Sequence, residues 1–265
     1  MKFLLVSDLH YALKQYDWTT EAAADFDVVV IAGDQIDIGG QLDGAVQVVV
    51  ILKHLRRLAA LTRLIVSSGN HDLDHRDDAD EKVAVWMNRV RDLGIPTDGD
   101  AIMLDGALIT ICPWWDGPRM KAAVHAQIER DAARPKDRWI WVYHAPPAGS
   151  PTSWGGHQFY GDTELAEWIE AYRPDLVFCG HVHQAPFRKG GSWVDRIGDT
   201  WVFNCGQQMG PTPTHIMIDT QAREAAWFSL AGAELVRLDA PLQRPLMALD
   251  AFPDWVKPPP GAALA

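Results

Sequence analysis

Five short apolar runs, each followed within three residues by side chains that bind metals, constrain this chain more than any other feature. The runs are 3–6, 28–32, 64–67, 139–143 and 176–179. The polar segments after them are Asp8-Leu9-His10, Gly33-Asp34, Gly69-Asn70-His71-Asp72, His144 and Gly180-His181-Val182-His183. Runs that are apolar throughout suit strands covered on both faces, and the Ser, Gly, Asn or Asp after each run favours strand over buried helix. Side chains at the ends of neighbouring strands converge, so the pattern predicts one cluster of Asp, His and Asn.

The rest of the chain predicts an α/β protein that becomes β-rich after residue 190. Helices are expected at 43–61, 81–93, 119–133 and 164–172, and further strands at 102–104, 108–112, 193–197, 200–204, 215–219, 225–230 and 234–238. This order fits two packed sheets flanked by helices. We expect a single domain over 1–240. Residues 241–265 contain six prolines and predict an extended tail without chemistry of its own.

Composition excludes some partners. The formal net charge of −11 argues against a nucleic-acid polymer, which needs a basic stripe. A small phosphate ester stays compatible, because metal ions can supply local positive charge. The only cysteines, Cys112, Cys179 and Cys205, are odd in number and lack CxxC spacing, so we expect free thiols in a reducing, cytoplasmic protein. No apolar run reaches membrane-spanning length, so no membrane partner is expected, and a homo-oligomer stays open.

The residue types in the five segments suit two adjacent cations. Asp34 follows the flexible Gly33 and is the best candidate for a carboxylate that bridges both ions and offsets their repulsion. Asp8 and His10 are two residues apart and point the same way in an extended segment, as do His181 and His183. Imidazole with carboxylate favours manganese, iron or zinc over calcium. Each segment alone is weak evidence, since Gly-Asp is usually a turn and a single histidine is usually structural. The conjunction of all five carries the prediction.

These motifs resemble those of the calcineurin-like metallophosphoesterase family, whose pattern runs D-x-H, G-D, G-N-H-[DE], H and G-H-x-H. The matching segments span residues 8 to 183. The resemblance implies a four-layer αββα sandwich, two mixed β-sheets flanked by helices, with two metal ions at the strand ends. It implies that one ion binds Asp8, His10, Asp34 and His183, and that the other binds Asp34, Asn70, His144 and His181.

The same resemblance gives His71 a catalytic role instead of a metal-binding one. A hydroxide bridging the two ions would attack phosphorus, while His71 protonates the leaving oxygen. Asp37, three residues after Asp34, matches the aspartate that pairs with this histidine in members with G-D-x-x-D. The alternative is that Asp37 merely caps the helix that follows.

Substrate contacts are harder to predict. The loop 145–161 is long, rich in Pro and Gly, and tethered to His144. Long loops of this kind are often lids or binding loops. Its Trp154 and His157 are candidates for substrate binding, and Trp114 is a candidate for the opposite wall. The alternative for the aromatic residues is edge packing that shields the core.

The predicted function is hydrolysis of a small phosphate ester, leaning to a phosphodiester. That lean rests on resemblance to compact family members that lack a large appended domain. A phosphomonoesterase and a nucleotide-type pyrophosphatase are the alternatives. A non-catalytic scaffold is disfavoured, because this chain retains every motif position. A nuclease is disfavoured by the acidic balance.

Overall fold

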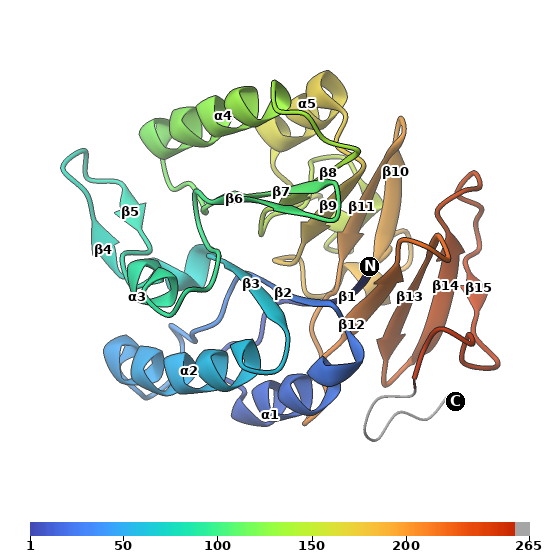
Figure 1. The fold of residues 1–265 in the computed structure, drawn as a ribbon, viewed down its shortest axis with the longest axis horizontal. Helices are drawn as coiled ribbons and strands as arrows, with labels where there is room; N and C mark the ends of the chain where they lie inside the picture. Colours follow the sequence, from blue (N-terminus) through green and yellow to red (C-terminus); the bar gives the residue numbers. More distant parts are fainter. Residues whose placement is uncertain (258–265) are drawn as a thin grey trace.

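The computed structural model describes residues 1–257 and contains two mixed β-sheets between layers of helices (Figure 1). The helices are α1 (Leu13–Ala22), α2 (Gly44–Ala59), α3 (Met87–Arg91), α4 (Pro118–Ala132) and α5 (Thr163–Tyr172). The first sheet contains β1 (Lys2–Val6), β2 (Val28–Ala32), β3 (Arg63–Ser67), β12 (His215–Asp219), β13 (Glu224–Ser229), β14 (Gly232–Arg237) and β15 (Met247–Ala248). The second contains β6 (Ala101–Leu104), β7 (Ala107–Ile111), β8 (Arg138–Val142), β9 (Leu176–Cys179), β10 (Val194–Ile197) and β11 (Thr200–Asn204). A separate hairpin pairs β4 (His75–Arg76) with β5 (Lys82–Val83).

The first sheet has a parallel half that ends at the edge strand β3 and an antiparallel half, whereas the second sheet has a parallel centre and antiparallel margins. The first runs β15-β14-β13-β12-β1-β2-β3, with β1, β2 and β3 parallel and β12 antiparallel to β1. The second runs β10-β11-β9-β8-β7-β6, with β7, β8, β9 and β11 parallel. Because parallel neighbours end at the same edge, the loops after β1, β2 and β3 meet, as do the loops after β8 and β9. This arrangement positions the predicted cluster.

Three apolar clusters fill the spaces between the layers. The cluster between the sheets includes Phe3, Val30, Ile109, Ile140 and Phe178, all fully buried. A second cluster joins the outer face of the first sheet to α1, α2 and α3, and a third joins the second sheet to α4 and α5. Helix on sheet on sheet on helix confirms the predicted αββα sandwich (Figure 1).

One helix prediction was wrong, and one helix was missed. The segment 81–93 is not one helix, because Lys82–Val83 forms β5 and only Met87–Arg91 is helical. Asp74 fixes this segment as a hairpin: its backbone N–H donates to the carbonyl of Val83, and its carboxylate accepts from the N–H of Val85 at 2.7 Å. Helix α1 was not predicted at all. Its buried face contains Gln15 and Thr19 and therefore lacks a clear apolar period.

The chain beyond residue 240 packs on the domain as far as it is described. Met247–Ala248 pairs with β14 and extends the first sheet. Trp255 donates its indole N–H to Glu224 at 2.7 Å, and Val256 is buried. The rest of the predicted tail, 258–265, lies outside the described residues. Within the described part, no helix has the length and apolar character needed to cross a bilayer.

Candidate metal centre

Seven predicted ligands lie together where the central strands of both sheets end. From the first sheet come Asp8 and His10 after β1, Asp34 after β2 and Asn70 after β3. From the second sheet come His144 after β8, and His181 and His183 after β9. The hydrogen bond from the N–H of Asp8 to the carbonyl of Gly33, at 3.1 Å, aligns two of these loops. The cluster therefore spans both sheets and joins residues up to 175 positions apart.

One group of ligand atoms comprises Asp8, His10, Asp34 and His183, and all of these atoms lie within 4.8 Å of one another. The Nε2 atom of His183 is 3.1 Å from Asp8 Oδ1 and 3.1 Å from His10 Nε2. The Nε2 atom of His10 is 3.6 Å from Asp34 Oδ2. Ring and carboxylate atoms so close together converge on one point, as the ligands of a cation do.

A second group comprises Asp34, His144 and His181 within the same 4.8 Å limit. Asp34 Oδ2 is 3.1 Å from His144 Nε2. Asn70 joins this group, since its Oδ1 lies 2.9 Å from His181 Nδ1. Asp34 is the residue common to both groups, in agreement with the position of a bridging carboxylate.

The surroundings of His144 prepare it for metal binding. Its Nδ1–H donates to the carbonyl oxygen of Ala32 at 2.7 Å, which directs Nε2 into the cluster. Nε2 is buried, 3.1 Å from Asp34 Oδ2, and carries a proton when no metal is bound, because the two carboxylates of Asp34 and Asp8 raise the pKa of this ring. A bound cation would displace that proton and take its place beside the carboxylates. This nitrogen therefore fits the metal that the family implies.

Backbone conformation and close packing hold the ligands in place. Asp8, His10, Asp34 and His181 have φ angles of 55°, 41°, 55° and 69°, a left-handed region that is unfavourable for side-chain-bearing residues. A Cβ on Gly33 would lie 2.2 Å from His144 Nδ1, so only glycine fits there. Such strain is typical of functional sites.

The electrostatics of the cluster favour a positive charge. Burial alone would raise the pKa of the carboxyls of Asp8 and Asp34, but His144 and neighbouring hydrogen bonds lower both below their usual value. Burial alone would lower the pKa of His144, yet the two carboxylates raise it to about 9. Burial lowers the pKa of His181 to about 4, which keeps that ring neutral and able to bind a metal.

His71 and Asp37 lie at the edge of the cluster, together with His10. Nitrogen and carboxylate atoms of these three residues are within 4.8 Å of one another. The His71 backbone N–H donates to Asp34 Oδ1 at 2.8 Å, and its ring Nδ1 is buried without a partner among the described residues. Asp37 accepts from the N–H of Gly39, whereas Asp43 caps α2. Asp37 is therefore not the helix cap of the alternative prediction.

Sequence reasoning missed one residue that braces the site. Asp72 is fully buried, and its carboxylate accepts the N–H groups of Gln35, Ile36 and Gly69 at 3.0, 3.2 and 2.8 Å. It thus ties the loop after β2 to the loop after β3. Burial raises its pKa well above the usual value. Its position directly after Gly69-Asn70-His71 was the available signal.

The three predicted substrate contacts lie in different places. The ring of Trp114 is next to the cluster, with its centroid 5.7 Å from that of His144 and 5.1 Å from that of His181. Trp154 donates its indole N–H to the carbonyl of Lys189, and His157 bonds the Tyr160 hydroxyl. Neither of these two lines the cavity that opens onto His10, His71 and His183.

Two mixed sheets with a histidine and carboxylate cluster at their shared edge define a metallophosphoesterase. The model of the calcineurin-like phosphoesterase family matches residues 1–185, more than two thirds of the chain. The protein therefore belongs to the calcineurin-like phosphoesterase family and is a hydrolase acting on phosphoric esters. No curated protein sequence matches the chain significantly.

One solved structure shares the fold at low sequence identity, and two others are similar to the chain at lower TM-scores. The crystal structure of TT1561 of Thermus thermophilus has a TM-score of 0.55 at 14% identity, covering 89% of this chain and 98% of that one. Yfce, a phosphoesterase from E. coli, has a TM-score of 0.42 at 15% identity, covering 90% and 94%. A metallophosphoesterase from Sphaerobacter thermophilus has a TM-score of 0.40 at 14% identity, covering 86% of each chain.

Proposed function

We propose that the protein hydrolyses a small phosphodiester with the help of two divalent metal ions. The observation that carries this proposal is the position of Asp34, whose carboxylate is shared by two groups of ligand atoms. One ion would be held by Asp8, His10, Asp34 and His183, and the other by Asp34, Asn70, His144 and His181. Manganese, iron and zinc suit this donor set. When bound, such ions neutralise charge on the phosphate oxygens and lower the pKa of a coordinated water.

His71 is the proposed general acid. It lies beside the cluster and not within either group of ligand atoms, and its ring centroid is 4.5 Å from that of His10. The Nδ1 atom has no partner among the described residues, so the ring is free to turn toward a leaving oxygen. Asp37 is close enough to orient the ring.

A cavity of about 610 Å³ beside His71 supports the diester over the monoester, because it leaves room for an alcohol on each side of the phosphate. A phosphomonoesterase and a nucleotide-type pyrophosphatase are the alternatives. Turnover of bis(p-nitrophenyl) phosphate and p-nitrophenyl phosphate, with manganese, iron and zinc in turn, tests this preference. A larger kcat/KM for the monoester would contradict the proposed diester specificity.

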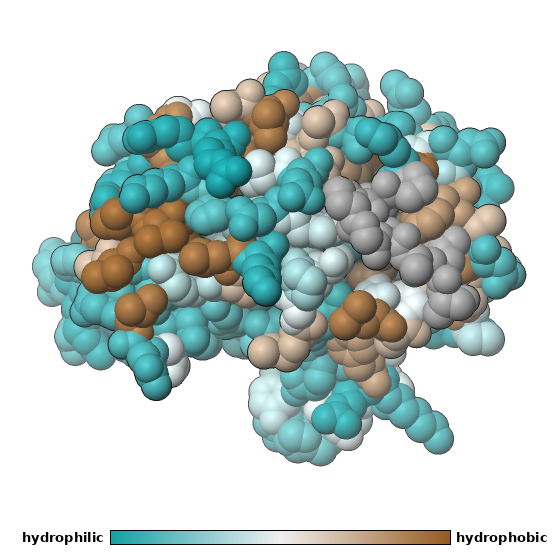
Figure 2. Space-filling model, turned by 90° about the horizontal axis from the view of Figure 1, so that it is seen from below, coloured by the Kyte–Doolittle hydropathy of each residue, from teal (hydrophilic) through white to brown (hydrophobic). Residues whose placement is uncertain are grey.

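Location and assembly are separate proposals. Three buried free cysteines support a reducing, cytoplasmic environment. An apolar patch over α2 supports a homo-oligomer (Figure 2); its exposed members include Ile38, Leu42, Val46 and Val49. Sedimentation should then detect a multiple of the 29.5 kDa chain mass, and a single 29.5 kDa species would refute self-association.

A further inference from the structure

The cavity beside the metal centre is lined by more than the proposed ligands. It is lined by His10, His71 and His183. It is also lined by Leu13 and Lys14 from the start of α1, and by Met209 and Pro211 from the loop before β12. One continuous cavity thus connects the proposed general acid with a surface built from segments that lie about 200 residues apart in sequence.

Lys14 is the only lysine or arginine in the lining of this cavity. It is exposed, and within the described chain it has no hydrogen bond or ion pair from its side chain. The neighbouring amides are already engaged: Gln15 donates to the carbonyls of Gln208 and Gly210, and Gln207 donates to the carbonyl of Asp8. The ammonium group of Lys14 is therefore an unengaged polar group in this lining.

The molecule as a whole is acidic, with a net charge of −11, whereas Lys14 adds a positive charge to the lining of this cavity. A single positive group at the mouth of a cavity attracts an anion there and repels a cation. The uncapped first turn of α1, whose N-cap is Ala12, adds partial positive charge at the same wall. Beside Lys14, Leu13, Pro211 and the 85% exposed Met209 offer apolar contact.

The leaving alcohol must lie within hydrogen-bond reach of the acid that protonates it. His71 and Asp37 both line this cavity, so the leaving alcohol occupies it. We propose that the leaving alcohol carries a second anionic group, a carboxylate or a phosphate, which pairs with Lys14 while its hydrocarbon part contacts Leu13 and Met209. This inference rests on the proposed function, since it assumes that His71 is the general acid.

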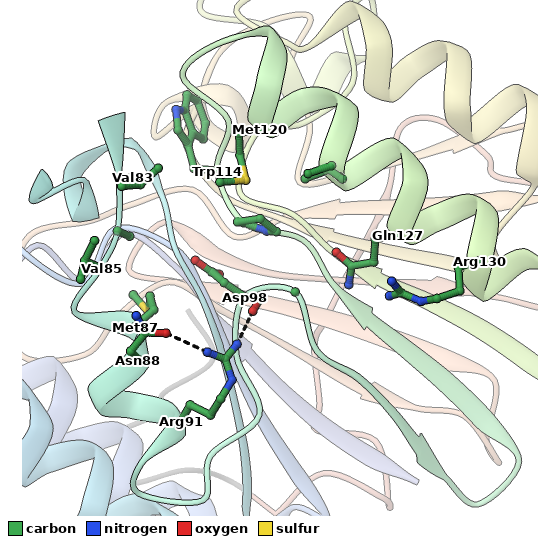
Figure 3. Close-up of a pocket in the computed structure, with 15 residues that line it drawn as sticks. Val83, Val85, Met87, Asn88, Arg91, Asp98, Trp114, Met120, Gln127 and Arg130 are labelled. Atoms are coloured by element: carbon green, nitrogen blue, oxygen red, sulfur yellow. Dashed lines mark hydrogen bonds between the residues drawn. The ribbon is translucent and has the colours of Figure 1, made fainter. Parts of the chain in front are cut away.

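The cavity beside Trp114 does not offer a comparable group. That cavity, of about 370 Å³, lies between α3 and α4, and Trp114 forms part of its wall (Figure 3). Its Arg91 is already engaged by Asn88 and Asp98, as the dashed lines in Figure 3 show, and by Asp100. Arg130 is next to Asp131. Neither arginine is free to bind an anionic substrate group.

The experiment compares two esters that differ by one carboxylate on the leaving group, 4-nitrophenyl methyl phosphate and 3-carboxy-4-nitrophenyl methyl phosphate. For Lys14→Ala, kcat/KM should fall about tenfold more for the carboxylate ester than for the other, mainly through KM, as for the loss of one charge-assisted hydrogen bond. Lys14→Arg should keep most of the preference, and Lys14→Glu should reduce it further. Lys53→Ala, an exposed lysine of α2 outside the cavity, is the matched control. A third ester with a phosphonomethyl group separates phosphate from carboxylate preference.

Binding is measured separately by calorimetry with phenyl methylphosphonate and its 3-carboxy derivative. If Lys14→Ala changes both esters equally and binds both analogues as the wild type does, the anionic subsite is refuted. If the wild type hydrolyses neither ester but binds the carboxy analogue about tenfold more tightly through Lys14, the proposed hydrolysis fails and the subsite stands. If it hydrolyses neither ester and shows no Lys14-dependent binding, both proposals fail.

Discussion

Asp34 is the side chain on which the proposed chemistry depends most. Its Oδ2 lies between His10 and His144, and its Oδ1 accepts the backbone N–H of His71. Asp34→Ala should therefore reduce bound metal toward zero and abolish turnover, measured by elemental analysis and a phosphodiester assay. Asp92→Ala, an exposed aspartate far from the ligand set in sequence, is the control. Normal metal content in Asp34→Ala would rule out the bridging role.

His71 should behave differently from every proposed ligand. His71→Ala should keep both metals and lose turnover by roughly 10²–10⁴-fold, the range for general acid catalysis. The reason is that its ring lies outside both groups of proposed ligand atoms. Metal analysis beside kcat separates the two roles. Loss of metal in this variant would show that His71 is a ligand and that the assigned role is wrong.

Gly33 offers a test of how tightly the ligands are packed. A Cβ at this position would lie 2.2 Å from His144 Nδ1, whereas a Cβ at Gly94 would meet nothing within 4 Å. Both glycines have positive φ, so both alanine variants carry similar backbone strain. Gly33→Ala should lose metal affinity at least tenfold more than Gly94→Ala in a metal titration. Equal affinities would mean that His144 is not held as described.

Single residues differ in how well the sequence predicts them. The positions of Asp8, His10 and Asp34 follow from strand ends, because a polar residue after a buried strand has few places to point. Lys14 and Asp72 carry no such local pattern. Lys14 lines the same cavity as Met209 from a distant loop, and this proximity depends on the tertiary fold.

A buried carboxylate helps to anchor the β4–β5 hairpin to α4. Glu81 is buried, and its two oxygens accept the N–H groups of Arg119 and Met120 at 2.7 and 2.8 Å. It thereby caps a helix whose own N-cap, Gly117, has no side chain. Glu81→Ala should lower the free energy of unfolding by about 1–2 kcal/mol.

Urea unfolding measures that change, with Glu129→Ala, an exposed residue of α4, as the control. A variant as stable as the wild type would show that the cap contributes nothing.

The prediction of one helix over 81–93 did not include this arrangement, because the spacing of apolar residues cannot reveal that Glu81 caps α4. Strands were predicted better, since 28–32, 176–179, 200–204 and 215–219 agree with β2, β9, β11 and β12 to the residue.

At the scale of the molecule, the proposed ligands join the two sheets. Asp8, His10 and Asp34 follow strands of the first sheet, and His144, His181 and His183 follow strands of the second. Ions bound there stabilise the folded state by mass action, by about 2.7 kcal/mol at a concentration 100 times Kd. Chelation should lower the Tm by about 5–10 °C, and manganese should restore it.

Scanning fluorimetry with and without chelator measures this shift, and Asp34→Ala provides the comparison, because it should not respond to either treatment. A shift of the same size in both proteins would place the stabilising ion elsewhere.

The sandwich itself was predictable from the order of strands and helices. A single cluster was predictable from the strand ends, whereas the division of its ligands between two ions was predictable only by resemblance.

The antiparallel pairing of β12 with β1 has a consequence for synthesis of the chain. Every proposed ligand lies before residue 184, yet the partner of β1 arrives only with His215–Asp219. A nascent polypeptide that has emerged as far as Ala185 would leave one flank of its innermost strand without hydrogen-bonding partners, open to pairing with another molecule. Emergence of β12, and not completion of the motifs, therefore marks the point at which this flank of β1 is covered.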